Sequence, residues 1–134
     1  GSANRLKQLQ MSDGTDVAYR LAKKFKIKTA WGTDVLFSAE KAAKQNQELA
    51  KLIRWYSSAE TLRMATSVNA ELLSMSGPRS PYAGVLGIVQ EGALADLLLV
   101  NGDPLENIQL IANPVENFLI VMKDGKIYKN LVSR

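Results

Sequence analysis

Asp34 is the residue of this sequence whose surroundings most strongly indicate chemistry. It follows an apolar run at residues 27–31 and one glycine, Gly32, and the chain turns apolar again at residues 35–37. A carboxylate just past the carboxyl end of a strand lies where α/β barrels and doubly wound sheets place their functional groups, and the glycine allows a close turn there. The same spacing also fits an aspartate that caps a helix or forms a turn, so both interpretations stay open.

Composition limits what Asp34 could do within this chain. The 134 residues include no histidine and no cysteine. These absences exclude disulfides and thiolate metal sites, and they remove the commonest metal ligand and the usual general base at neutral pH. No Gly-x-Ser-x-Gly elbow, P-loop or dinucleotide fingerprint is present. Hydrolysis of an unactivated amide needs a metal-bound water or a nucleophile with its base, and the sequence offers neither.

The other acidic residues that we considered resemble turn formers. Asp96, Asp103 and Glu106 lie among short apolar runs broken by glycine and proline. Asp103 could be read as half of a calcium loop, but no spacing of acids supports that interpretation, and a Gly-Asp-Pro turn is favoured.

Aromatic and basic residues have a structural and a functional interpretation each. Trp31, Trp55 and Tyr56 could line a pocket, but aromatic residues at strand or helix period are more often core. The net charge of +4 is concentrated at residues 20–28. That cluster could attract phosphate or acidic partners, but the interpretation as a solvated helix face is favoured. No aromatic residues interleave with the cations to stack on bases, so binding of nucleic acid is not expected.

The elements that would position these residues follow from periodicity. Apolar spacings of three and four, together with a short apolar run, predict a helix at 13–26, a strand at 27–31, a helix at 42–56 and a helix from Ser58 to Gly77-Pro78. Ser57 and Glu60 have the spacing of a capping box at the start of the last helix. From Gly84 the period changes, and strands are predicted at 85–89, 96–100, 117–123 and 126–129. Asp124-Gly125 predicts a type I′ hairpin turn.

Four ordered segments together resemble the C-terminal end of the metal-dependent amidohydrolase superfamily. They are WGTD at 31–34, SSAETLRMATSVNAELLSM at 57–75, GVLGIVQEGALADLLLVNGDPLENI at 84–108 and VMKDGKIYKN at 121–130. The subgroup that they resemble most is that of imidazolonepropionase-like and Xaa-Pro dipeptidase-like enzymes. The resemblance covers about residues 14–130, with Asn101 standing where relatives commonly have aspartate.

The resemblance implies an α/β fragment: the last strand and helices of a (β/α)8 barrel plus a C-terminal β-sandwich module. On this basis residues 1–11 are expected to be a tag or linker, residues 12–80 the end of the barrel, and residues 81–134 the sandwich. A whole barrel needs about 250 residues, so most of it would lie outside this chain.

The resemblance also implies a role for Asp34. In such proteins the eighth barrel strand ends in Gly-Thr-Asp, and its aspartate sits at the metal centre and handles the proton of the hydrolytic water. Asp34 matches that catalytic and metal-binding position, so an intact parent is expected to hold zinc or another divalent metal and to cleave a small amide or dipeptide-like substrate. The family's other ligands are absent, so this chain alone is expected to hold no metal and to be inactive. The helix with Thr66 and Asn69 is expected to be mainly structural.

A second hypothesis treats the chain as a stand-alone, self-associating module descended from an amidohydrolase. An unpaired strand at 27–31 and apolar helix stripes would be covered by a second copy, which predicts a homo-oligomer. No nucleic acid or membrane partner is expected. Because no run of about 18 apolar residues occurs, we expect a soluble chain, cytoplasmic by default, although a parent could carry a signal peptide upstream.

Overall fold

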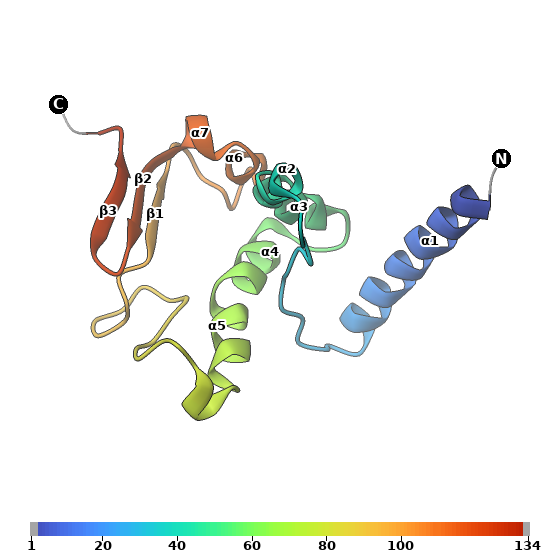
Figure 1. Cartoon of the computed structure of the whole chain (residues 1–134), viewed down its shortest axis with the longest axis horizontal. Helices are drawn as coiled ribbons and strands as arrows, with labels where there is room; N and C mark the ends of the chain where they lie inside the picture. Colours follow the sequence, from blue (N-terminus) through green and yellow to red (C-terminus); the bar gives the residue numbers. More distant parts are fainter. Residues whose placement is uncertain (1–2, 133–134) are drawn as a thin grey trace.

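The structure is a computed structural model that describes residues 3–132, and it runs from helices into a small sheet (Figure 1). The helical part contains α1 (Ala3–Lys24), α2 (Ala39–Ala42), α3 (Gln45–Ala50), the 3-10 helix η1 (Lys51–Arg54), α4 (Ser58–Ala65), α5 (Ser67–Ser74) and the 3-10 helix η2 (Gly77–Arg79). The second part contains β1 (Leu97–Val100), α6 (Gln109–Ala112), α7 (Pro114–Asn117), β2 (Phe118–Lys123) and β3 (Lys126–Asn130). The coarse prediction of a mixed α/β chain is therefore confirmed.

A small core joins the central helices to the sheet. Its buried members come from α3, η1, α4, α6 and the start of β2, with Tyr56 and Ile108 just outside these elements: Leu49, Leu52, Tyr56, Met64, Ile108, Ile111 and Phe118. A side-chain hydrogen bond from Asn46 Nδ2 to the carbonyl oxygen of Ile111, at 3.1 Å, ties α3 to α6. The sheet is thereby anchored to the helices at one end of β2.

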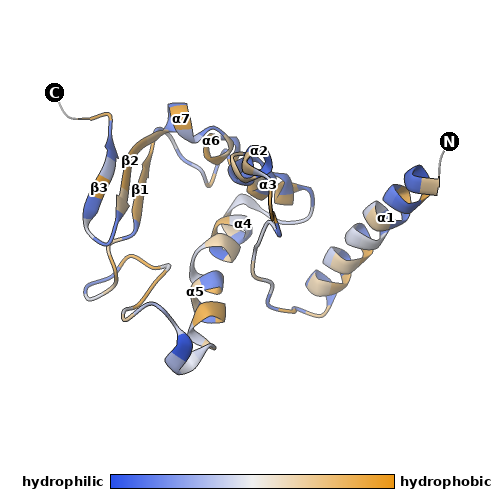
Figure 2. Ribbon diagram, viewed as in Figure 1, coloured by the Kyte–Doolittle hydropathy of each residue, from blue (hydrophilic) through white to orange (hydrophobic). Residues whose placement is uncertain are grey.

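The sheet has three antiparallel strands in the order β1-β2-β3. Val100, Phe118 and Val121 pack on the core. The register shift between Leu99 and Val100 adds one residue to β2 there, and it puts Phe118 and Val121, three residues apart, on the same face. The opposite face carries Leu99, paired with Ile120, and Ile127, paired with Met122. Leu99 is 46% and Ile127 47% exposed, so this face is uncovered at both residues. The ribbons of β1 and β2 have the colour of hydrophobic residues in Figure 2.

Two local predictions are confirmed in atomic detail. The Ser57 hydroxyl accepts a hydrogen bond from the Glu60 backbone N–H at 3.2 Å, and the Glu60 carboxylate accepts one from the Ser57 backbone N–H at 2.7 Å. Asp124 and Gly125 both have positive φ, +47° and +75°, which is the geometry that a type I′ turn requires. The strands predicted at 96–100, 117–123 and 126–129 correspond to β1, β2 and β3.

The predicted strand at 27–31 is wrong. Residues 27–36 form neither helix nor strand, since a barrel strand is held by neighbouring strands and no strand of the described chain lies beside this segment. Residues 3–132 therefore do not show the barrel part of the predicted fold, which stays a prediction. These residues form one three-stranded sheet, and because a sandwich needs two sheets, the predicted β-sandwich module stays a prediction.

The remaining differences concern element boundaries. Residues 3–11, expected in a tag or linker, lie within α1, and residues 1 and 2 fall outside the described chain. The helix predicted at 42–56 is divided into α3 and η1, and the one beginning at Ser58 is interrupted at Thr66, whose φ and ψ are −119° and −94°. The strand predicted at 85–89 is reduced to an isolated bridge. The division near residue 80 stays a prediction.

The molecule exposes much more surface than is expected for a folded monomer of its mass. Its accessible surface is 10130 Å², whereas a folded monomer of 14.7 kDa is expected to expose roughly 6,900 Å². The N-terminal half of α1, which projects from the rest of the chain in Figure 1, contributes to this excess, because residues 3–15 are all exposed. No helix among residues 3–132 combines the length and apolar character needed to cross a membrane.

Candidate functional site

Asp34 lies at the surface, in the irregular segment that follows α1. It is exposed and has a φ of +51°, a left-handed conformation that aspartate tolerates better than most residues. The turn before it is held by a hydrogen bond from the Val35 backbone N–H to the Thr33 hydroxyl at 3.4 Å. Within residues 3–132 no group of three or more histidine, cysteine, aspartate or glutamate side chains gathers, so Asp34 does not belong to a set of protein ligands large enough for a usual metal site.

The segment that carries Asp34 is fixed to α5 by the side chain of Asn69. The Trp31 backbone N–H donates to Asn69 Oδ1 at 3.0 Å, and Asn69 Nδ2 donates to the Trp31 carbonyl oxygen at 3.0 Å. The backbone N–H and the carbonyl oxygen of Trp31 are thus both paired by the side-chain amide of Asn69, much as a neighbouring strand would pair them. Asn69 therefore holds the chain three residues before Asp34 in the absence of a barrel sheet.

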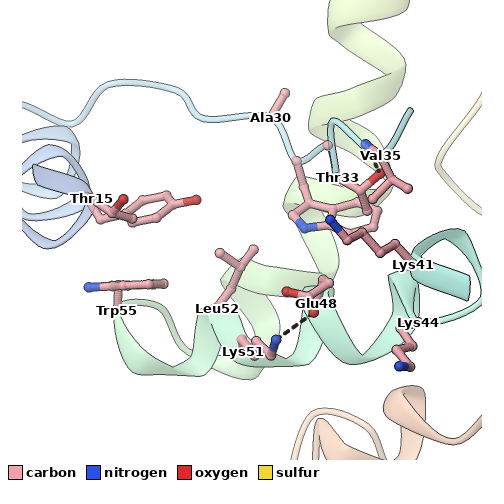
Figure 3. Close-up of a pocket in the computed structure, with 13 residues that line it drawn as sticks. Thr15, Ala30, Thr33, Val35, Lys41, Lys44, Glu48, Lys51, Leu52 and Trp55 are labelled. Atoms are coloured by element: carbon pink, nitrogen blue, oxygen red, sulfur yellow. Dashed lines mark hydrogen bonds and ion pairs between the residues drawn. The ribbon is translucent and has the colours of Figure 1, made fainter. Parts of the chain in front are cut away.

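A cleft of about 520 Å³ opens beside this segment (Figure 3). Its lining comes from α1, from residues 30–35 and from α2 through η1: Thr15, Tyr19, Ala30, Trp31, Gly32, Thr33, Val35, Lys41, Lys44, Glu48, Lys51, Leu52 and Trp55. Asp34 is not among the lining residues. Asp34 is therefore adjacent in sequence to two residues that line the cleft, Thr33 and Val35, but it is not itself part of the cleft.

One wall of the cleft is built where α1 packs on η1. The rings of Tyr19 and Trp55 have centroids 4.5 Å apart at an interplanar angle of 31°, and Tyr19 meets Tyr56 edge-on at 5.6 Å. Trp55 Nε1 donates to Asp16 Oδ1 at 2.7 Å, and the other oxygen of that carboxylate pairs with Arg54. These contacts hold the Trp55 ring in place, so this wall is preorganised.

The sequence left open whether the aromatic residues belong to the core or line a pocket, and the structure shows some of each. Tyr56 is buried in the core, as the structural interpretation predicts. Trp31 and Trp55 are half-buried, pack against the core and also line the cleft.

Two of the five cations at residues 20–28, Lys23 and Lys28, form ion pairs within the described chain. Lys23 donates to the Trp55 carbonyl oxygen at 3.0 Å and lies 3.5 Å from the Glu60 carboxylate. Lys28 pairs with Glu71 at 2.7 Å. These partners favour the interpretation of the cluster as a solvated face over that of a phosphate site.

The acidic residues other than Asp34 have structural surroundings. Asp103 Oδ1 accepts a hydrogen bond from the Leu105 backbone N–H at 2.8 Å, which confirms that Asp103 forms a turn. Asp96 Oδ1 accepts one from the Asp124 backbone N–H at 2.7 Å and so supports the β2-β3 turn. In the capping box, the hydrogen bond from the Ser57 backbone N–H lowers the pKa of Glu60 below its ordinary value of 4.5.

Solved structures of hydrolases resemble this chain over most of its length. A crystal structure of an amidohydrolase matches with 33% sequence identity and a TM-score of 0.72, covering 87% of this chain. A crystal structure of a prolidase complexed with N-methylphosphonate-L-proline matches with 30% identity and a TM-score of 0.70, covering 84% of this chain. A third match, with 30% identity and a TM-score of 0.69, is to an uncharacterized protein. No family model matches the sequence, and no curated protein does.

These similarities are consistent with a fragment of an amidohydrolase-like protein, as the sequence motifs indicate. The chain covers only 26% of the amidohydrolase structure and 26% of the prolidase structure. It corresponds to about a quarter of such a protein, so the activity of a whole amidohydrolase does not transfer to it directly.

Proposed function

We propose that this chain is the C-terminal part of a metal-dependent hydrolase that cleaves amide or peptide-like C–N bonds. The observation that carries the proposal is the 33% identity to an amidohydrolase over 87% of the chain. The prolidase match narrows the substrate class, because the ligand of that protein carries a phosphonate group on proline. A small amide or dipeptide with proline on the leaving side is therefore the substrate class that we propose for the parent.

Within the proposed parent, Asp34 is the carboxylate of the metal centre and the acid/base group. Its position supports this role, since it follows Gly32 and Thr33 at the end of a segment that Asn69 holds in a strand-like way. The described residues alone do not fit a zinc site, because a single carboxylate cannot complete the usual set of four ligands. We therefore assign no catalytic step to this chain by itself and propose that it is inactive alone.

A chimera tests this proposal. Residues 12–134 replace the corresponding part of the amidohydrolase that they resemble, and hydrolysis of a proline dipeptide is measured with and without a chelator. We expect chelator-sensitive turnover, and a fall in kcat of about 100-fold or more in the chimera with Asp34→Asn, as for loss of a general acid/base. The matched control is Asp13→Asn, an exposed aspartate on α1, which should leave kcat unchanged.

Two results would contradict the proposal in different ways. An Asp34→Asn chimera with undiminished kcat would remove Asp34 from the chemistry. Zinc-dependent turnover by the isolated 134-residue chain would show that the missing ligands are not needed.

The surface area favours self-association as a second candidate function. The excess of roughly 3,000 Å² over an ordinary monomer is more than the roughly 1,000 to 2,500 Å² that one subunit contributes to a large obligate interface. The uncovered sheet face with Leu99 and Ile127 is apolar, as such interfaces are. Sedimentation equilibrium of the isolated chain at about 1 to 100 μM should then show a dimer. A monomer throughout that range of concentrations would exclude self-association as a function.

A further inference from the structure

The cleft between α1 and η1 has aromatic residues on both of its sides. Tyr19 and Trp55 form the preorganised wall described above, Trp31 contributes from the irregular segment, and Leu52 also lines the cleft. In Figure 3 Trp55 stands on one side of the opening, and Thr33 and Val35 mark the other. The volume of about 520 Å³ lies within the range of small-molecule sites. Aromatic walls favour a flat ring, because rings gain both buried area and stacking contacts there.

The charge of the lining is positive, and one cation is available for a ligand. Lys51 is paired with Glu48 at 2.6 Å, and Lys44 is paired with Glu40 at 2.6 Å. Lys41, by contrast, forms no ion pair with any residue from 3 to 132. Figure 3 shows its side chain reaching from α2 toward the interior of the cleft. A carboxylate on the ligand would supply the partner that Lys41 lacks.

From these observations we infer that the cleft binds a small planar aromatic carboxylate, with its ring among the aromatic and aliphatic side chains that line the cleft and its carboxylate on Lys41. Because Asp34 does not line the cleft, this site is separate from the proposed hydrolytic centre. The inference rests on the isolated chain and not on the proposed parent activity, so each can fail without the other.

The two tryptophans of the chain serve as reporters, since Trp31 and Trp55 both line the cleft and no other tryptophan is present. The isolated chain, labelled with ¹⁵N, is titrated with 2-naphthoate while the two indole N–H resonances are followed by NMR. We expect saturable shifts of both resonances. The neutral analogue 2-naphthalenemethanol should bind more weakly, and acetate, which has no ring, should not displace 2-naphthoate.

Lys41→Gln tests the proposed contact with the carboxylate. It should weaken 2-naphthoate binding about threefold to fivefold, the loss expected for one partly exposed ion pair, and leave binding of the neutral analogue unchanged. The matched control is Lys7→Gln, an exposed lysine in the projecting half of α1, which should change neither. Circular dichroism of each variant checks that the fold is retained.

Three results would overturn the inference. Absence of saturable shifts would exclude a site in the cleft. Equal affinity for the acid and the alcohol, together with an unchanged Kd in Lys41→Gln, would exclude an anion site. Displacement of 2-naphthoate by acetate would show that charge alone, without the aromatic walls, accounts for binding.

Discussion

Asn69→Ala removes both hydrogen bonds that fix the segment before Asp34 to α5. Each of these bonds is 3.0 Å long and only partly buried. Neutral hydrogen bonds of this kind contribute about 0.5 to 1.5 kcal/mol each, so the free energy of unfolding should fall by about 2 kcal/mol. Asn69→Asp keeps an acceptor for the Trp31 backbone N–H but puts a carboxylate oxygen where the donor faced the Trp31 carbonyl oxygen. Because these two acceptors repel each other, Asn69→Asp should also destabilise the chain, by at least as much as the lost bond.

The assay is urea unfolding followed by tryptophan fluorescence, together with hydrogen exchange at the Trp31 backbone N–H. Alanine is a better helix former than asparagine, so Asn4→Ala, at an exposed position of α1, serves as the control for helix propensity. Exchange at Trp31 should accelerate in Asn69→Ala and not in Asn4→Ala. A loss below about 0.5 kcal/mol with unchanged exchange would show that the amide pair does not hold the segment.

Two further predictions concern other contacts of α4 and α5. Gly87 has a φ of +72° and a Cβ added there would lie 2.5 Å from the Thr66 carbonyl oxygen, so Gly87→Ala should lower the free energy of unfolding by about 3 kcal/mol. Gly92→Ala, with a similar φ of +83° but open space around it, should cost only about 1 kcal/mol, and equal losses would refute the proposed clash. Because the pKa of Glu60 is lowered in the folded chain, the stability that it contributes is present above pH 4.5 and is lost as the pH falls below it. Glu60→Gln, which keeps the hydrogen bond from Ser57, should reduce this acid sensitivity, as thermal unfolding between pH 3 and 7 (about the range over which carboxyl groups titrate) would show.

Features that depend on neighbouring residues could be predicted from the sequence. The capping box of Ser57 and Glu60 and the turn at Asp124-Gly125 are each specified within four residues, and both are present. The strands that follow Gly84 were predicted for the same reason, except at residues 85–89. There Gly87 adopts a positive φ and packs against the backbone of Thr66, which a regular strand would not allow.

Features that depend on distant residues could not be predicted in this way. The apolar run at 27–31 has the composition of a strand, but a strand forms only beside a partner, and none lies beside it in the described chain. The pairing of Asn69 with Trp31 spans 38 positions and leaves no local signal. The cleft likewise requires α1 to pack on η1 through Asp16 and Trp55, which no short motif specifies.

Its local spacing made Asp34 a candidate with two open interpretations, and only the resemblance gave it a catalytic role. An exposed aspartate shortly after a glycine is common in turns, and the structure gathers no group of three or more potential metal ligands within residues 3–132. Its role therefore remains a proposal that the chimera tests.

The large accessible surface also bears on how cooperatively the isolated chain unfolds. An unfolded chain of 14.7 kDa exposes roughly 21,000 Å², so this fold buries about a fifth less surface than an ordinary protein of its mass. Both the dependence of stability on urea concentration and the heat capacity change of unfolding scale with the surface that is newly exposed. The chain should therefore melt over a broader range of urea and of temperature than its length would suggest, and a partner that covered the sheet and α1 would sharpen the transition.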